Sequence, residues 1–345
     1  MAKKQSLVGI CFAGVQKLYV SDNPESTFDS PEATKNPESI TKNLDEVQYL
    51  RWMGMAAKIQ QRNEVMDGYT ERALESFRKD GFACTTLKGQ GIAKLYGTLA
   101  GLRQSGDIDL WVQGGRKRLY EYSLKTFGKL EGLTYHHIHF PVFDDAEVEA
   151  HVWPAFFTSP FANRCFHKFC RLHAPKANCA DTPSLAFNRV FILQHCYGHF
   201  CGHGVGFRQL LDYYFVLMQG FSEEERTESM RWIERLGMKR FTAAVMWLCR
   251  EVFGMPDGSR ICEPNEKDGR FLLEEVLETG NMGHHDERVD KRELQSPTGR
   301  YLHNLKRDWR VARIAPHYAL WEPLWGIFQF CFCKYISLKY KRKNT

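Results

Sequence analysis

The sequence has no low-complexity tract, no internal repeat and little excess of charge of either sign. Its 345 residues contain 47 Lys or Arg and 41 Asp or Glu, so the formal net charge is only +6. Proteins that bind nucleic acid concentrate basic residues on one face. A small, dispersed surplus favours phosphate-bearing substrates without requiring nucleic acid, and the basic segment 116–129 is typical of a solvated helix face.

The cysteines also lack a pattern. The eleven cysteines have no regular spacing, and several fall in apolar helical segments. This distribution argues against a disulfide framework and favours reduced thiols. The apolar run 7–13 follows Lys3 and Lys4 as in a signal peptide, but no small-residue cleavage site comes after it. The expected location is therefore the cytoplasm.

No uninterrupted hydrophobic run is long enough to cross a membrane, which requires about 20 predominantly apolar residues. The aromatic-rich stretch 318–338 is broken by Glu322, Pro323 and Lys334. The favoured interpretation is a terminal helix that docks on the core. Because basic residues follow it, peripheral contact with an anionic membrane is the weaker alternative.

The length of the chain allows two modest domains. Residues 1–80 are expected to form an N-terminal loop and helical segment, with apolar residues at helical spacing over 44–79. Residues 81–155 are expected to form a small core of strands and helices. Residues 156–345 are expected to form a helical C-terminal domain.

Apolar patterns order the elements of the core and of the C-terminal domain. In the core, strands are expected at 82–87, 107–112, 135–142 and 146–153, and helices at 90–97 and 116–129. This order predicts an α+β fold with a small mixed β-sheet and helices on one side of it. Beyond Pro154, helices are expected at 183–200, 206–219, 223–236, 238–253, 267–279, 298–313 and 318–338.

Two carboxylates lie two residues apart in the apolar run 107–112. In an extended strand Asp107 and Asp109 point to the same face, and Ile108 and Leu110 to the other, where they can pack. Neighbouring carboxylates repel each other unless a cation or a proton lies between them. Oxygen ligands at this spacing suit Mg²⁺, which completes its shell with water and substrate phosphates.

A glycine turn precedes these carboxylates. Lys88-Gly89 opens a short helix, and the backbone N–H groups of such a turn can meet phosphate oxygens. A third carboxylate would complete a metal site, and Glu149 on the strand 146–153 offers one, with Glu147 on the same face as the fallback. Together these residues predict a metal-dependent nucleotidyltransferase site.

Three segments carry a resemblance to a known family, namely LKG…LYG…LRQSGDIDLWV, VEAHVW and LQHCYGH…GFRQLLDYY. They resemble the uncharacterised bacterial nucleotidyltransferase family of the DNA polymerase β-like superfamily over residues 48–220. The resemblance implies a polymerase β-like core, Mg²⁺ or Mn²⁺ as cofactor and a nucleoside triphosphate as substrate. By position it makes Asp107 and Asp109 the metal-binding pair and Glu149 the third catalytic and metal-binding acid.

The same resemblance implies the nucleotide-binding residues. Lys88 and Gly89 would form the phosphate-facing turn, and Arg103 matches the arginine that precedes the Gly-Asp-x-Asp segment. The superfamily has Gly-Gly or Gly-Ser where this chain has Lys88-Gly89. For both Lys88 and Arg103, an ion pair within the protein is the alternative to a phosphate contact.

The predicted reaction moves a nucleoside monophosphate from the triphosphate to an acceptor and releases pyrophosphate. The acceptor stays open among a small molecule, a sugar, a protein and an RNA end. Two other functions also stay open. One is a catalytically inactive, nucleotidyltransferase-like binding or interaction module. The other is a zinc hydrolase, because His195 and His199 share a helix face at the spacing i, i+4.

Two further polar groups have simpler interpretations. Arg208 and Asp212 are four residues apart on an expected helix, and an ion pair between them is the favoured interpretation. The histidines of the strand 135–142 alternate along it, but the sequence gives them no defined role.

Overall fold

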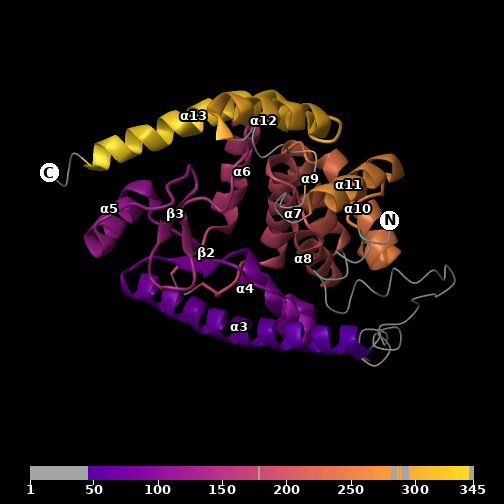
Figure 1. Ribbon diagram of the computed structural model, residues 1–345, viewed down its shortest axis with the longest axis horizontal. Coiled ribbons are helices and arrows are strands. Elements are labelled where there is room, and N and C mark those ends of the chain that lie inside the picture. The colour runs from indigo at the N-terminus through magenta and orange to yellow at the C-terminus, as the bar shows by residue number, and fades with distance from the viewer. Residues whose placement is uncertain (1–45, 178, 281–285, 287, 289–294, 342–345) are drawn as a thin grey trace.

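The computed structural model describes residues 46–341 except 178, 281–285, 287 and 289–294 (Figure 1). The loop and apolar run expected before residue 44 lie outside this part of the chain. In chain order the elements are α3 (Glu46–Lys79), β1 (Cys84–Thr86), α4 (Lys88–Ala93), the 3₁₀ segment η2 (Lys94–Leu102), β2 (Ile108–Val112), α5 (Gly115–Phe127), β3 (His137–Phe140), β4 (Val148–His151), α6 (Pro160–His173), α7 (Leu185–Gly202), α8 (Phe207–Met218), α9 (Glu223–Arg235), α10 (Lys239–Phe253), η3 (Asp257–Ser259), α11 (Glu266–Thr279), α12 (Pro297–Val311) and α13 (Pro316–Lys341).

Four short strands form one mixed sheet in the order β1-β2-β4-β3. Strands β2 and β4 run parallel, whereas β1 and β3 are antiparallel to their neighbours. Helices precede and follow the strands in the chain. The expected α+β fold, with a small mixed sheet between helical segments, is therefore confirmed.

The two faces of this sheet differ in chemistry because side chains alternate along each strand. One face is apolar and buried, and it consists of Ile108, Leu110, Val112, Ile138, Phe140, Val148 and Ala150. Helices α3 and α5 cover this face with side chains such as Met66, Phe77 and Leu119. The packing expected for the residues on either side of Asp109 is thus confirmed. The opposite, polar face carries the carboxylates and histidines described below.

Helices α6 to α13 build the rest of the described molecule, and most of them were expected. No helix was expected over 160–173, where the structure has α6. Its start signals are local, because the Ser159 hydroxyl accepts a hydrogen bond from the Ala162 N–H and Pro160 occupies the first turn. Its buried apolar stripe is only Phe166, Phe169 and Cys170, which is too short to stand out among the charged residues. The domain boundaries at 80 and 155 stay a prediction.

Helix α13 docks on the molecule through one face, at the edge opposite to α3 (Figure 1). Its Ile336 and Tyr340 are buried in the same apolar cluster as the covered face of the sheet, so the expected docking is confirmed for this face. Its outward side chains, among them Leu320 and Ile327, are exposed. Among the described helices, none is both long and apolar enough to span a membrane.

Candidate active site

A cavity of about 780 Å³ lies against the polar face of the sheet, with helices α7 and α8 contributing to its wall. All six residues predicted for the site line this cavity, so the fold brings them together. Their catalytic and binding roles stay predictions. The lining includes Lys88, Gly89, Arg103, Asp107, Asp109, His137, Glu147, Glu149, His195, His199 and Arg208.

Strand register explains how distant carboxylates and imidazoles meet on this face. Asp109 of β2 lies opposite Glu149 of β4, and Glu149 lies opposite His139 of β3. In the next row His151 lies opposite His137. Residues paired in this way across neighbouring strands have their side chains within contact distance. The polar face is therefore a compact array of two carboxylates and three imidazoles.

Asp109 is the most buried acid of the array, with only 2% of its side chain exposed. Its Oδ1 lies 2.7 Å from the Nζ atom of Lys88 and 2.8 Å from the Nε2 atom of His151. Burial alone would raise the pKa of Asp109, but the Lys88 ammonium and the His151 imidazole hold it well below its usual value. Asp109 is thus a carboxylate that stays ionised only because positive charge faces it.

Lys88 supplies this charge from an unusual backbone position. Its φ is +37°, and it is the one residue other than glycine with a positive φ in the described chain; Gly89 follows with φ +25°. A left-handed backbone favours glycine, so Lys88 occupies a position that a glycine would adopt more easily. Burial would lower the pKa of Lys88, but the Asp109, Asp107 and Glu149 carboxylates raise it. The ion-pair alternative stated for Lys88 is therefore present in the structure.

Asp107 lies one residue before β2 and is half-buried. The charge of Asp109, helped by burial, raises the pKa of Asp107 above its usual value. Both carboxylates line the cavity, as their spacing predicted. Their mutual repulsion, which Lys88 only partly offsets, is the electrostatic condition that a bound cation relieves.

Glu149 and His151 form the next part of the array, on strand β4. The Oε2 atom of Glu149 lies 3.1 Å from His151 Nε2, so one imidazole nitrogen joins Glu149 to Asp109. Burial would raise the pKa of Glu149, but its hydrogen bond with His151 lowers it. Ligand atoms of Asp109, Glu149 and His151 lie within 4.8 Å of one another. The sequence assigned no role to His151, although its spacing of two residues from Glu149 placed it on the same face.

Strand β3 adds two histidines that the sequence left without a role. His137 Nδ1 lies 3.2 Å from Glu149 Oε2, and His139 Nε2 lies 3.4 Å from Glu149 Oε1. His139 Nδ1 contacts the carboxylate of Glu147, the residue named as the fallback for Glu149. The side chain of Glu147 is 55% exposed and that of Glu149 only 14%. Glu149 is accordingly the acid that faces the array, and Glu147 supports it from the rim.

Arg103 is held by Asp212 of helix α8. Its Nε and Nη2 atoms donate to the two carboxylate oxygens at 2.9 and 2.7 Å, and Tyr96 Oη donates to the same carboxylate at 2.6 Å. All three side chains are buried. This bidentate pair is the structural alternative expected for Arg103, and its contact with nucleotide stays a prediction.

The prediction that Arg208 forms an ion pair with Asp212 is wrong, because each residue has a different partner. Arg208 donates instead to the carbonyl of Gln104 at 2.9 Å, because Arg103 already engages both carboxylate oxygens of Asp212. The helical spacing brought Arg208 near the carboxylate, but an arginine distant in the sequence binds it with bidentate geometry.

The rings of His195 and His199 on helix α7 meet edge to face, with centroids 4.4 Å apart and planes at 90°. Both line the cavity, and burial lowers the pKa of His199 to about 3. Each of the groups of three closely spaced ligand atoms found in the described chain is built on strands β2 to β4 or the residue before β3, and none includes these two residues. His195 and His199 therefore contribute neutral imidazoles to the cavity wall, and the described chain places no third zinc ligand beside them.

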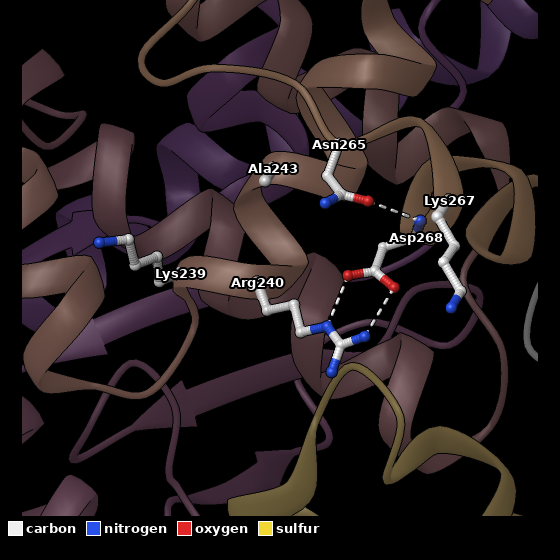
Figure 2. A pocket seen from close by; sticks show the side chains of 6 residues that line it. All are labelled: Lys239, Arg240, Ala243, Asn265, Lys267 and Asp268. Carbon is white, nitrogen blue, oxygen red and sulfur yellow. Dashed lines mark hydrogen bonds and ion pairs between the residues drawn. The ribbon is translucent and has the colours of Figure 1, made fainter.

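A separate pocket lies on the helical part of the molecule, at helices α10 and α11 (Figure 2). Its carboxylate, Asp268, accepts hydrogen bonds of 2.5 and 3.0 Å from Arg240, and its backbone N–H donates to Asn265. Arg240 thus neutralises the one acid that lines this pocket. The chemistry typical of an active site is concentrated at the sheet.

The family match agrees with this geometry. Residues 1–254 match the family described as uncharacterised nucleotidyltransferase. Because the match covers most of the chain, the protein belongs to this family, which supports a nucleotidyltransferase function in general. No curated protein and no solved structure matches the sequence.

Proposed function

We propose that this protein transfers a nucleoside monophosphate from a nucleoside triphosphate to an acceptor, with release of pyrophosphate, in the cavity at the polar face of the sheet. The observation that carries the proposal is the convergence of Asp107, Asp109 and Glu149 on one cavity beside the Lys88-Gly89 turn. Three carboxylates, on two neighbouring strands and directly before one of them, are a donor set that suits nucleotidyl transfer. Membership in the family supports this reaction class.

The donor set fits a divalent cation. Asp107 and Asp109 repel each other strongly enough to raise the pKa of Asp107, and the Lys88 ammonium already compensates Asp109 at 2.7 Å. These residues, with Glu149, would hold Mg²⁺ or Mn²⁺. The ion would neutralise charge on the triphosphate and acidify the acceptor hydroxyl.

The protein's own groups have distinct tasks in this proposal. Lys88 balances the Asp109 carboxylate and, once a cation replaces it there, is free to pair with a phosphate oxygen. Glu149 accepts the proton of the acceptor hydroxyl, and His151 fixes the orientation of Glu149 through the 3.1 Å contact. The neutral imidazoles of α7 bound the cavity on the other side. Gly89 lets the turn adopt its left-handed backbone.

A second candidate is a binding module that keeps the fold without catalysis. The observation that favours it is Lys88 itself, because its ammonium pairs with the acid that would bind metal. In that case a triphosphate would bind without being consumed. Label transfer separates the two functions.

The test uses purified full-length protein, Mg²⁺ or Mn²⁺, cell extract as the source of acceptor, and each triphosphate labelled at its α-phosphate. We expect one triphosphate to label an acceptor and to release pyrophosphate. Asp109→Asn should abolish both signals, whereas Asp144→Asn, which changes an exposed acid outside the cavity, should leave them unchanged. Absence of label with all four triphosphates, together with binding of one of them, would establish the second candidate.

A further inference from the structure

Glu149 faces two imidazoles that the proposed transfer does not use. Each of its oxygens lies near one ring nitrogen, at 3.2 Å from His137 Nδ1 and 3.4 Å from His139 Nε2. Ligand atoms of these three side chains lie within 4.8 Å of one another. The antiparallel pairing of β3 with β4 fixes this arrangement, because His139 is the register partner of Glu149.

The surroundings of the two histidines match those of metal ligands. A metal-binding histidine usually donates its other ring N–H to a carboxylate, and His139 does so, with Nδ1 on Glu147 while Nε2 faces Glu149. His137 Nδ1 is buried and makes no hydrogen bond of acceptable geometry within the described chain. A buried nitrogen without a hydrogen bond is costly unless another partner satisfies it.

We propose that His137, His139 and Glu149 bind a divalent transition-metal ion, such as Zn²⁺, beside the carboxylate site of Asp107 and Asp109. Imidazole nitrogens favour transition metals, whereas Mg²⁺ prefers oxygen ligands. The inference extends the proposed function, since Glu149 belongs to both sites. The proposed transition-metal site on β3 and β4 is rich in nitrogen ligands, whereas the carboxylate site at β2 offers oxygen ligands.

The experiment measures Zn²⁺ binding to nucleotide-free, full-length protein by competition with a chromophoric chelator. We expect one Zn²⁺ per chain in the wild type and about a 100-fold loss of affinity in the double variant His137→Ala/His139→Ala. Glu147→Gln should weaken binding about tenfold, because a carboxylate that accepts the ring N–H of a metal-bound histidine contributes that much. Since Glu147 is half exposed, this variant should fold normally. His199→Ala, a histidine of the same cavity outside every group of ligands, is the matched control and should bind as the wild type does.

Failure of this inference is distinct from failure of the proposed function. If the wild type transfers nucleotide with Mg²⁺ but binds Zn²⁺ no better than the double variant, the second site is wrong and the function stands. If Zn²⁺ binds through His137 and His139 while no triphosphate is consumed, the site stands and the function is wrong. Loss of Zn²⁺ binding in His199→Ala with wild-type binding in Glu147→Gln would also overturn the site and would favour the α7 histidines.

An independent observation concerns the outer face of helices α12 and α13. Large apolar side chains of both helices are strongly exposed, and Leu320, Leu324 and Ile327 form a stripe along α13 at spacings of four and three residues. A group of large exposed apolar side chains usually marks an interaction site. The exposed fractions are 86% for Trp309, 70% for Leu320, 58% for Leu324, 60% for Ile327, 60% for Tyr335 and 55% for Leu338.

The charge around this stripe identifies its partner. Arg300, Lys306, Lys334 and Lys339 are exposed along these two helices. Arg307, Arg310 and Arg313 instead pair with acids within the molecule. A symmetric contact with a second copy would bring these cationic surfaces together, whereas anionic lipid headgroups complement them. We infer that the α12–α13 face lies on an anionic membrane surface, with the apolar stripe at the boundary between headgroups and acyl chains.

Co-sedimentation of the full chain with vesicles tests this surface. We expect binding to phosphatidylcholine vesicles that contain about one third phosphatidylglycerol, with weakening at high salt, and little binding to phosphatidylcholine alone. Leu324→Asp/Ile327→Asp should reduce binding at least tenfold. Leu50→Asp, an exposed leucine on α3 at the opposite edge (Figure 1), should not. No binding to anionic vesicles would overturn the inference, as would a dimer in sedimentation analysis that only the double variant disrupts.

Discussion

The two faces of the central sheet come from the same four strands and yet have opposite chemistry. On one face Leu110 and Ile138 are fully buried among the apolar side chains of α3 and α5. On the other, His151 lies within hydrogen-bond distance of both Asp109 and Glu149. A strand can serve both purposes because its side chains alternate. The apolar face stabilises the fold, and the polar face concentrates charge that the fold must hold in place.

Substitutions on the two faces should therefore affect different properties of the protein. Substitutions under the apolar face should lower the free energy of unfolding and leave turnover per folded molecule intact. Substitutions on the polar face should abolish turnover with a smaller effect on stability.

The largest effect is expected for Asp109→Asn. Loss of this carboxylate removes a ligand of the proposed cation and the partner of Lys88, so nucleotide transfer should fall by about 10³-fold. The thermal midpoint should change far less than this activity. The measurement is pyrophosphate release at equal concentrations of folded protein. Retention of more than a tenth of the activity would contradict the assignment of Asp109.

Leu119→Ala should have the opposite profile. Leu119 lies on α5 with 1% of its surface exposed, in the apolar cluster beneath the sheet. Removal of a buried leucine should cost about 2–5 kcal/mol of unfolding free energy, measured by urea denaturation. Turnover per folded molecule should stay near the wild-type value. A selective loss of turnover would show that the two faces are not separable.

Gly91→Ala tests the close approach of α4 to the sheet. A Cβ atom at Gly91 would lie 2.7 Å from the Thr86 carbonyl oxygen, and the resulting displacement should cost about 1–3 kcal/mol. The matched change Gly68→Ala, on α3 with no atom within 4 Å, should instead stabilise the helix by about 0.5–1 kcal/mol. Thermal unfolding of both variants gives the comparison, and equal shifts would contradict the packing described for α4.

The smallest effect concerns an acid that faces another acid. Burial, together with Glu322, raises the pKa of Asp308 to about 7, above the 3.8 expected for an unfolded chain. The folded state therefore keeps a proton that the unfolded state releases, so this contribution to stability is present in acid and is lost as the pH rises toward 7. Asp308→Asn should flatten the dependence of the melting temperature between about pH 4 and pH 7. An unchanged slope would contradict this assignment.

Part of the site could be predicted from the sequence, because the Asp107–Asp109 pair and the Lys88-Gly89 turn each lie within one short segment. Alternation along one strand is enough to place Asp107 and Asp109 on one side and Leu110 on the other. The Lys88-Gly89 turn is also visible in the sequence, although its left-handed lysine is not. Such a backbone depends on the partner that Lys88 finds in Asp109.

The remaining features depend on pairing between distant segments. His139 reaches Glu149 only through the register of β3 with β4, and a change of register by one residue would send it to the other face. Arg103 reaches Asp212 across 109 residues. The spacing of residues within one segment does not reveal such contacts. For this reason the sequence gives the β3 histidines no role, and it predicts an Arg208–Asp212 pair where Arg208 instead contacts a backbone carbonyl.

The central claim is that the polar face of the sheet binds a nucleoside triphosphate together with a divalent cation. Isothermal titration of the full chain with each of the four triphosphates, with and without Mg²⁺, tests it most directly. We predict that at least one triphosphate binds only in the presence of Mg²⁺, that Asp109→Asn loses this binding and that Leu119→Ala keeps it. Binding that is absent for all four triphosphates, or unchanged in Asp109→Asn, would contradict the claim.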